Sequence, residues 1–304
     1  MRLRCLLCIS ADTGLMSSDP RTLIVTTSLS LSQKVIGIDS NSLDTARQAV
    51  EANGVSSTVS LVQKKAEALT REDLGLGPEE GVDVIVSEWM GYGLLFEDML
   101  PSVLHVRDLF LKPGGSLFPN AASLYFAGWS DKEGAELPPG AKRLSWWNSV
   151  HGVDMSAFAP MLLSSAQVEN VPSSQVITSV SKIWTADLTS ISAQELDFKV
   201  PFEFVMTTAG PLDGFVLSFD VAFDGPGCKE VLDTQPGSPP THWKQTVLML
   251  DPRAAPEALE SGAVVTGVLA MTRSTQNSRD YNLALQWAVK DGVSGEQTWT
   301  LAAH

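Results

Sequence analysis

The chain has 304 residues, 44% of them hydrophobic and 18% charged, which is typical of a globular protein long enough for two domains. Its net charge of −14 argues against direct binding to nucleic acid and favours a basic partner. No apolar run reaches the roughly 20 residues of a membrane span. The apolar start at Met1–Ile9 is too short for a secretory signal, so we expect an intracellular protein.

The three cysteines are too few for a disulfide framework. Cys5 and Cys8 form a single C-x-x-C pair without a second pair of ligands. We interpret them as small apolar side chains in a strand, and no bound metal is expected.

The first part of the chain alternates between strand-like and helix-like patterns. Lys34–Asp39 has the character of a parallel strand that ends in an acid, and Leu43–Ala52 carries a helical pattern. Three further strands are expected, at Val59–Val62, Val82–Val86 and Ser116–Phe118. A second helix is predicted over Glu97–Leu111. This alternation predicts an α/β fold, a doubly wound (Rossmann-like) domain over residues 1–119.

Beyond Pro119 the patterns change to short strands separated by proline and glycine clusters. The strand-like segments include Ser123–Gly128, Phe215–Phe223, Thr246–Leu250 and Leu283–Val289. Several alternate with a period of two, so we predict an all-β barrel or sandwich domain over residues 120–304. Within it, Trp146–Met155 is rich in tryptophan and predicted to be partly helical, and adjacent tryptophans more often fill a core than contact a partner.

The segment Ser87–Leu100, called the acid loop below, is the most informative part of the chain. Glu88 and Glu97 lie nine residues apart, and Gly91 and Gly93 between them permit a tight reversal that turns both acids toward one pocket. The loop also supplies apolar and aromatic neighbours, namely Trp89, Met90, Tyr92 and Phe96. Such an acid pair suits a planar guanidinium, which carboxylates bind through two hydrogen bonds. A solvated loop with two unrelated glutamates is the simpler alternative.

Ser87–Gly93, followed by a second acid at Glu97, closely resembles the double-glutamate loop of protein arginine N-methyltransferases. Thr241–Gln245 resembles the second signature of that family, in which His242 and Trp243 border the substrate arginine near the two glutamates. The type I class, and its arginine methyltransferase 6 branch, are the most similar. The resemblance covers most of the chain and implies a Rossmann-like S-adenosylmethionine-dependent methyltransferase domain, then a β-barrel domain with a helical dimerisation arm.

The resemblance implies transfer of a methyl group from S-adenosylmethionine to arginine ω-nitrogens of proteins such as histones, giving mono- and asymmetric dimethylarginine. Glu88 and Glu97 would be the catalytic pair that holds and polarises the guanidinium, which is too basic to be deprotonated beforehand because its pKa exceeds about 12. Positioning and preorganised charge would supply much of the rate acceleration. The implied substrate contacts are Trp89, Met90, Tyr92, His242 and Trp243.

Cofactor contacts are expected at the carboxyl ends of the parallel strands. Asp39 is placed to accept a hydrogen bond from a ribose hydroxyl, although strand-end acids do the same for nicotinamide cofactors. Glu67 matches the family position near the adenine amino group, and a surface acid beside Lys64 and Lys65 is the alternative. Ser87 is a further candidate cofactor contact.

The N-terminal part departs from the family pattern. Relatives carry a glycine-rich turn after the first strand, and here its acid and two of its glycines are replaced by Cys8, Ser10 and Asp12. Only Thr13 and Gly14 match, and they are the remaining candidates for cofactor contact in this turn. The following helix and the N-terminal helices that cap the cofactor in relatives are missing. A truncated or mis-assembled gene product and a degenerate relative that binds cofactor poorly are both open explanations.

The resemblance also implies that residues 142–160 form a dimerisation arm, so a homodimer in the nucleus and/or cytoplasm is expected, with the nucleus inferred from resemblance alone. Arginine-rich proteins such as histone tails would be the substrates, and neither nucleic acid nor a membrane is an expected partner. A catalytically silent relative that binds arginine-rich proteins or dimerises with an active enzyme is the alternative function. A nicotinamide oxidoreductase fits Asp39 but explains neither the acid loop nor Thr241–Gln245.

Overall fold

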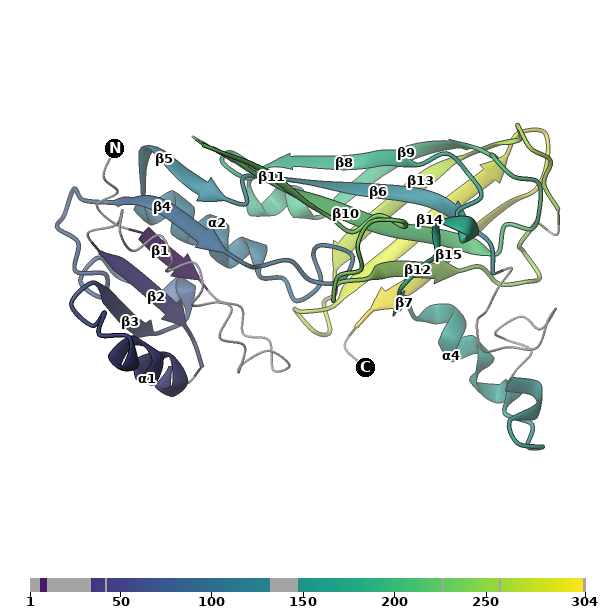
Figure 1. Cartoon of the computed structure of the whole chain (residues 1–304). Coiled ribbons are helices and arrows are strands. Elements are labelled where there is room, and N and C mark those ends of the chain that lie inside the picture. Colours follow the sequence, from purple (N-terminus) through teal and green to yellow (C-terminus); the bar gives the residue numbers. More distant parts are fainter. Residues whose placement is uncertain are drawn as a thin grey trace.

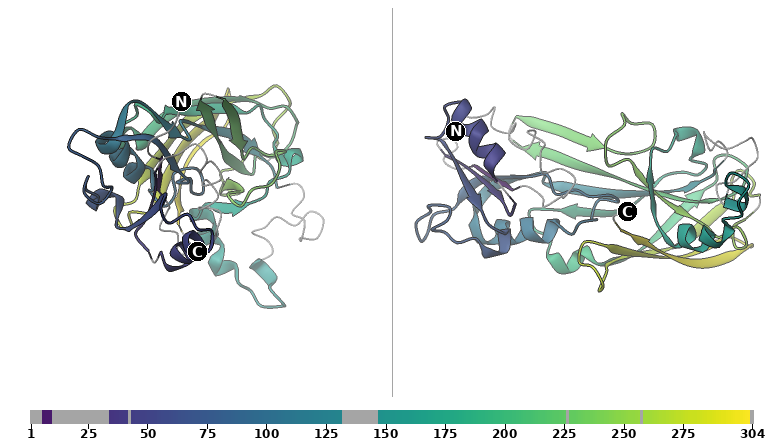
Figure 2. Two further views of the ribbon diagram at one scale, coloured as in Figure 1. Left: turned by 60° about the vertical axis from the view of Figure 1, so that its left-hand side comes forward. Right: turned by 90° about the horizontal axis from the view of Figure 1, so that it is seen from below.

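The computed structural model of the chain describes residues 6–9, 34–41, 43–131, 147–225, 227–256 and 258–302. The described residues form an elongated molecule with a parallel sheet at one end and antiparallel strands at the other (Figure 1). Figure 2 shows the same division from two further directions. The predicted α/β domain followed by an all-β domain is therefore confirmed as the architecture of the described chain.

The parallel sheet contains five strands in the order β3-β2-β1-β4-β5. Their bounds are Leu6–Ile9 for β1, Val35–Asp39 for β2, Val59–Gln63 for β3, Val82–Ser87 for β4 and Leu111–Phe118 for β5. The first strand lies at the centre and pairs in parallel with both β2 and β4. Ligands of such sheets bind beyond the carboxyl ends of the strands at the point where the strand order reverses, which here is beside β1.

Two α-helices accompany this sheet: α1 spans Asp44–Ala52 and packs on β3, and α2 spans Leu100–Phe110 and packs on β4 and β5. A short 3₁₀ helix, η2, covers Ala66–Ala68. The helix expected to start at Glu97 begins three residues later, because Glu97 and Asp98 have φ values of 80° and 53° that a right-handed helix excludes. No helix in the described part of the chain is both long and apolar enough to cross a lipid bilayer.

Strand β5 begins at Leu111, earlier than the strand predicted at Ser116. The segment between these residues pairs with β4 irregularly, with a register shift between Val82 and Val84. The sequence Lys-Pro-Gly-Gly there resembles a turn, and Gly114 does have a positive φ of 76°. The pairing with β4 nevertheless makes this segment part of the strand.

The second domain is built from two antiparallel sheets. One has the order β7-β12-β10-β6-β8, with β11 paired to β10, and the other has the order β15-β14-β13-β9. The strands are β6 Ala121–Trp129, β7 Gln167–Glu169, β8 Ser181–Asp187, β9 Phe198–Val205, β10 Gly214–Gly225, β11 Cys228–Asp233, β12 Gln245–Met249, β13 Val264–Arg273, β14 Tyr281–Val289 and β15 Ser294–Leu301. Strand β14 alternates between buried and exposed residues, as a strand covering a core should.

Aromatic side chains join the two sheets of the second domain. Phe126 of β6 and Phe215 of β10 stack with ring centroids 5.2 Å apart, and Phe126 meets Phe202 of β9 edge-on at 5.2 Å. Phe204 of β9 completes the group at 5.6 Å from Phe126. Because these residues come from both sheets, their burial fixes the sheets face to face.

A helical segment projects from the second domain, and α4 forms the part nearest the antiparallel strands (Figure 1). It consists of η3 Trp147–Ser149, η4 Ser156–Phe158 and α4 Ala159–Ser164. Val153, Phe158 and Met161 in this segment are exposed. The partly helical character expected here is confirmed for residues 147–160, whereas residues 142–146 of the predicted arm lie outside the described residues.

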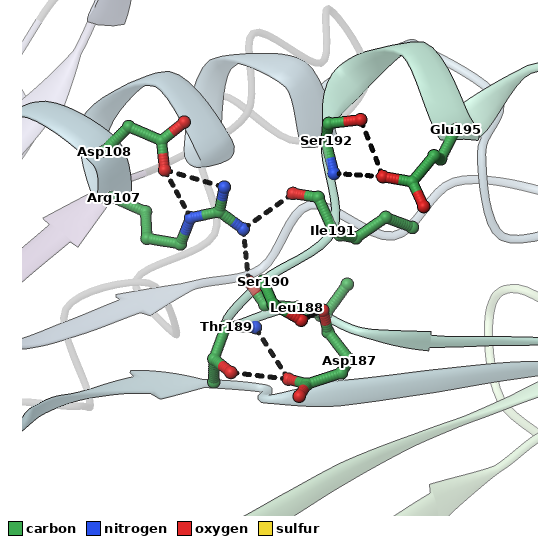
Figure 3. Close-up of polar contacts among 9 residues, drawn as sticks. All are labelled: Arg107, Asp108, Asp187, Leu188, Thr189, Ser190, Ile191, Ser192 and Glu195. Carbon is green, nitrogen blue, oxygen red and sulfur yellow. Dashed lines mark hydrogen bonds and ion pairs between the residues drawn. The ribbon is translucent and has the colours of Figure 1, made fainter.

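The two domains share one continuous hydrophobic core, and a buried arginine joins them. Arg107 of α2 is only 8% exposed and donates hydrogen bonds to the carbonyl oxygens of Leu188 at 2.7 Å and Ile191 at 2.9 Å (Figure 3). These carbonyls belong to the segment between β8 and η6, which spans Ala193–Leu196. A smaller 3₁₀ helix, η5, covers Ser173–Gln175.

The segment between β8 and η6, whose carbonyl groups accept hydrogen bonds from Arg107, is itself stabilised by two acids. The backbone amide and hydroxyl of Thr189 donate to Asp187 at 2.9 and 2.6 Å, and those of Ser192 donate to Glu195 at 2.9 and 2.7 Å (Figure 3). These local hydrogen bonds help to orient the carbonyl groups that accept from Arg107.

Arg107→Ala should lower the free energy of unfolding by about 2–3 kcal/mol, because it removes charge-assisted hydrogen bonds and leaves two carbonyl groups at the domain interface unpaired. Urea unfolding followed by tryptophan fluorescence measures this change. Arg253→Ala, which removes an exposed ion pair with Asp251, is the control and should not move the midpoint. Equal midpoints for the two variants would contradict a structural role for Arg107.

Candidate active site

The acid loop leaves the carboxyl end of β4 and reverses immediately. Gly91 and Leu94 exchange backbone hydrogen bonds of 2.9 and 3.0 Å. A Cβ atom added at Gly91 would lie 1.9 Å from the carbonyl oxygen of Phe96, and Gly93 has a φ of +55°. The first position therefore has no room for a side chain, and the second has a conformation that side chains disfavour. The predicted glycine-dependent reversal is confirmed.

Two hydrogen bonds tie the acid loop to the second domain. The indole nitrogen of Trp243 donates to the carbonyl oxygen of Met90 at 2.8 Å, and the backbone amide of Glu97 donates to the carbonyl oxygen of Arg279 at 2.8 Å. Trp89, Met90 and Trp243 are all buried. The contact of Trp243 with Met90 places the turn after Pro240 against the acid loop.

The remaining predicted substrate contacts lie around this junction. Tyr92 is partly buried and stacks on Phe96 with ring centroids 5.8 Å apart. His242 is exposed, and its ring centroid is 3.8 Å from that of Trp243. Aromatic and imidazole faces thus flank the loop, and such faces are favourable neighbours for a guanidinium.

The two loop glutamates influence each other electrostatically. Burial of its carboxyl group, followed by the charge of Glu97, raises the pKa of Glu88 to about 7, although a hydrogen bond from the Met90 backbone opposes the shift. Glu88 keeps an exposed surface, so surrounding protein atoms only partly replace its water. The charge of Glu97 reaches Glu88, so the two carboxyl groups lie near each other.

Glu97 has a cationic neighbour, Arg279. The guanidinium of Arg279 lies 3.3 Å from the Glu97 carboxylate, and the side chains are 45% and 17% exposed, respectively. The distance is long for a charge-assisted hydrogen bond, and the arginine is half in solvent. The pair is therefore loose enough to rearrange when another guanidinium arrives.

A cavity of about 280 Å³ lies between the carboxyl end of β2, η2, the acid loop and the second domain. Its described lining includes Asp39, Lys65, Glu67, Glu97, Asp98 and Arg279. The structure thus brings the two predicted cofactor acids, Asp39 and Glu67, into one cavity with a predicted catalytic acid. Of the two predicted catalytic acids, Glu97 lines the cavity, whereas Glu88 is not among its described lining residues.

Asp39 and Glu67 are both prepared to accept hydrogen bonds. Asp39 ends β2, and its carboxylate accepts from the backbone amide of Asn41 at 2.8 Å. Burial tends to raise the pKa of Glu67, but the hydrogen bonds from the Ser102 hydroxyl and from its own backbone amide outweigh it, and the pKa is lowered. Both carboxyl groups can therefore accept hydrogen bonds from hydroxyl or amino groups.

Three predicted cofactor contacts remain. Ser87 is buried at the end of β4, next to the start of the acid loop. Thr13 and Gly14 lie outside the described residues.

Sequence reasoning missed Asp98, Ser102 and Arg279, which also line the cavity. Asp98 follows a recognised motif residue and could have been suspected from its position. Arg279 has no comparable signal, because it enters the site only through the packing of distant strands.

Comparisons with known proteins agree with this geometry. Residues 120–292 match the family model described as the arginine methyltransferase oligomerization subdomain. The chain is 34% identical over 267 residues to protein arginine N-methyltransferase 1 of Saccharomyces cerevisiae, covering 86% of this chain and 72% of the relative. It is 35% identical over 248 residues to protein arginine N-methyltransferase 1.1 of Arabidopsis thaliana, covering 81% of this chain and 60% of the relative.

Solved structures give the same result. The Trypanosoma brucei PRMT1 enzyme-prozyme heterotetrameric complex with AdoHcy superposes with a TM-score of 0.84 at 28% identity, covering 99% of this chain and 90% of that chain. A crystal structure of PRMT6 has a TM-score of 0.69 at 21% identity, covering 94% and 91%, which supports the fold alone.

A Rossmann-like domain joined to a β-barrel domain, with an acid loop at their junction, defines the two-domain methyltransferase class. Within that class, the chain belongs to the protein arginine N-methyltransferase family. The particular likeness to arginine methyltransferase 6 is not confirmed, because the relatives matched at 34–35% identity carry the number 1 in their names.

Glu88→Gln should flatten the pH dependence of stability. In the folded protein Glu88 keeps its proton up to about pH 7, whereas in the unfolded chain it loses it near the ordinary value of 4.5. The folded state therefore binds more protons between these values, and stability falls as pH rises through that window. As pH rises through this window, the free energy of unfolding of the wild type should fall by about 1 kcal/mol more than that of the variant. This is well below the full linkage value because Glu88 is partly exposed.

Urea unfolding of both proteins at about pH 5 and about pH 8 measures this difference. If the free energies of unfolding of the two proteins changed by the same amount over that range, a raised pKa of Glu88 would be contradicted.

Proposed function

We propose that this chain transfers the methyl group of S-adenosylmethionine to an arginine ω-nitrogen of protein substrates. The observation that carries the proposal is the acid loop, whose Glu97 lines a cavity together with Asp39 and Glu67 and whose Glu88 lies close enough to feel the charge of Glu97. Family membership supports it, since the matched relatives are named as protein arginine N-methyltransferases. The trypanosomal neighbour contains AdoHcy, the form of the cofactor that has lost its methyl group.

The described cavity residues fit this cofactor. Asp39 at the end of β2 can accept from ribose hydroxyls, and Glu67, as an anion, can accept from the adenine amino group. When bound, S-adenosylmethionine supplies an electrophilic methyl group on a sulfonium. Ser87 and the loop itself would border the reacting end of the cavity.

The acid pair would hold a substrate guanidinium and fix its plane. Both carboxylates can accept pairs of N–H donors, and concentrating the positive charge on the held side leaves the free nitrogen richer in electrons. Arg279 contacts Glu97 only loosely, so the substrate can share or displace it. The ionised form of Glu88 is favoured again by the arriving cation, so that binding releases a proton near pH 7.

Glu88 would also receive the proton that the methylated nitrogen gives up. The protonated nitrogen formed by methyl transfer is far more acidic than a carboxylic acid, so ionised Glu88 can accept its proton even though the bound cation lowers the pKa of Glu88. Glu97 keeps the substrate in place during this step because Arg279 and the second domain hold its backbone.

The finer assignments follow from the sequence resemblance. We propose type I products, asymmetric dimethylarginine after monomethylarginine, and basic protein segments such as histone tails as substrates. The net charge of −14 supports a basic substrate because it attracts cations toward the site. A nuclear and/or cytoplasmic location is proposed on the same resemblance.

We also propose that the chain forms a homodimer through residues 147–164. Exposed apolar side chains in this projecting segment, among them Phe158 and Met161, are poorly placed for solvent and well placed for a second copy. The matched family model, described as an oligomerization subdomain, includes this segment.

Glu88→Gln and Glu97→Gln should each lower methyl transfer to an arginine-containing histone-tail peptide by at least about 100-fold, because each removes half of the charge that holds the guanidinium. Radiolabelled methyl incorporation measures the rate, and calorimetric titration measures cofactor binding separately. Glu203→Gln, an exposed glutamate on β9, is the matched control and should keep wild-type activity.

Retained activity in Glu97→Gln would contradict the paired-carboxylate mechanism. Absence of cofactor binding by the wild-type chain would instead favour the catalytically silent alternative.

Phe158→Asp together with Met161→Asp should convert a dimer into monomers, because a charge in an apolar interface must be desolvated without a partner. Sedimentation velocity measures the change, and we expect the dissociation constant to rise at least about tenfold. Val293→Asp, at another exposed apolar residue in the β14–β15 turn, is the control. A wild-type monomer, or a dimer that tolerates both charges, would contradict the proposed arm.

A further inference from the structure

The backbone of the acid loop has an unfavourable conformation where it carries its second acid. Leu94, Glu97 and Asp98 have φ values of 75°, 80° and 53°, in the left-handed region that residues with a Cβ atom disfavour. Two of these residues are consecutive and include the catalytic candidate. Such a conformation persists only where surrounding contacts stabilise it.

Leu94 is held by hydrogen bonds within the loop, whereas Glu97 and Asp98 are also bonded to one short segment of the second domain. The Glu97 amide donates to the carbonyl oxygen of Arg279, and the hydroxyl of Tyr281 donates to the Asp98 carboxylate at 2.8 Å. Tyr281 is the first residue of β14 and is completely buried. Adjacent loop residues are thus attached to residues two apart in the second domain, which restrains the loop in position and in rotation.

The end of β13, which pairs with Tyr281, is also held in place by hydrogen bonds. Tyr281 pairs in register with Arg273 at the end of β13. The Arg273 backbone amide and guanidinium both donate to the Asp197 carboxylate, each at 2.7 Å. Tyr281 therefore lies on a paired strand end whose neighbour is hydrogen-bonded to Asp197, and not on a free loop.

We propose that Tyr281 and Asp98 form a positioning pair that orients Glu97 toward the substrate guanidinium. This inference rests on the proposed function and adds residues for which the sequence suggested no role. Neither residue needs to touch the reacting atoms, because Asp98 acts through the backbone that it shares with Glu97. The pair makes the orientation of a catalytic acid in one domain depend on a strand of the other.

A buried tyrosine–aspartate hydrogen bond could instead serve stability alone, and the chain contains a matched example. On the β6–β10 face of the second domain, the hydroxyl of Tyr125 donates to the Asp220 carboxylate at 2.6 Å. Tyr125→Phe makes the same chemical change as Tyr281→Phe, but at a pair that is not attached to the acid loop. Comparing the two separates positioning from a general loss of one hydrogen bond.

The experiment measures kcat with an arginine-containing histone-tail peptide, binding of S-adenosylhomocysteine by calorimetry, and hydrogen exchange at the Glu97 amide. Tyr281→Phe and Asp98→Ala should each lower kcat about tenfold and speed this exchange about tenfold. In Tyr281→Phe, whose side chain is not among the described lining residues of the cavity, the dissociation constant for S-adenosylhomocysteine should stay within about twofold. Their double variant should be no worse than either single one, because both break the same link. Asp98→Asn keeps an oxygen that accepts from Tyr281 and should retain most of the activity.

Tyr125→Phe should change neither kcat nor the exchange of the Glu97 amide. Unchanged kcat and exchange in Tyr281→Phe, or multiplied effects in the double variant, would overturn the proposal. If Tyr281→Phe does not fold, Asp98→Ala against Asp98→Asn makes the same comparison without altering the buried ring. If the wild-type chain transfers no methyl group, the proposed function fails, and the exchange measurements still decide whether the pair positions the loop.

Discussion

The site depends on keeping two carboxyl groups near each other on one short loop. Burial, and then the charge of Glu97, raise the pKa of Glu88. The loop adds three non-glycine residues with positive φ, each costing roughly 1–2 kcal/mol. The hydrogen bonds from Trp243 and to Arg279 contribute only about 1 kcal/mol each. Burial of the loop's own apolar side chains must therefore supply much of the remaining stabilisation.

This requirement explains why the site lies at a domain junction. A loop at the end of a parallel strand is normally exposed to solvent, where its apolar residues would have nothing to pack against. Here the second domain covers it, and Arg107 of the helix that follows the loop is bonded to carbonyl groups of that same domain. Both ends of the acid loop are thus restrained relative to the β domain. A catalytic geometry that neither domain could maintain alone results from their packing.

The sequence allowed prediction of those features that local patterns encode. The reversal at Gly91 and Gly93, the acid at the end of β2 and the turn at Trp243 all depend on residues close together in the chain, and the structure has them as expected. The start of α2 was misplaced because the helical pattern includes Glu97, whose backbone is turned by contacts made far along the chain. Tyr281 could not have been found from sequence, since its hydroxyl meets Asp98 only after strand β14 has packed in place.

The two acids differ in their surroundings even though the sequence presents them as equivalent. Glu97 has a cation 3.3 Å away, and its backbone is held by a hydrogen bond to the second domain. The surroundings of Glu88 disfavour its charge, which makes its proton exchangeable at neutral pH. Under the proposed function, a substrate that arrives as a cation and leaves with one proton fewer would use both kinds of acid: one to hold it and one to take the proton. The burial that disfavours the charge on Glu88 would then serve the reaction.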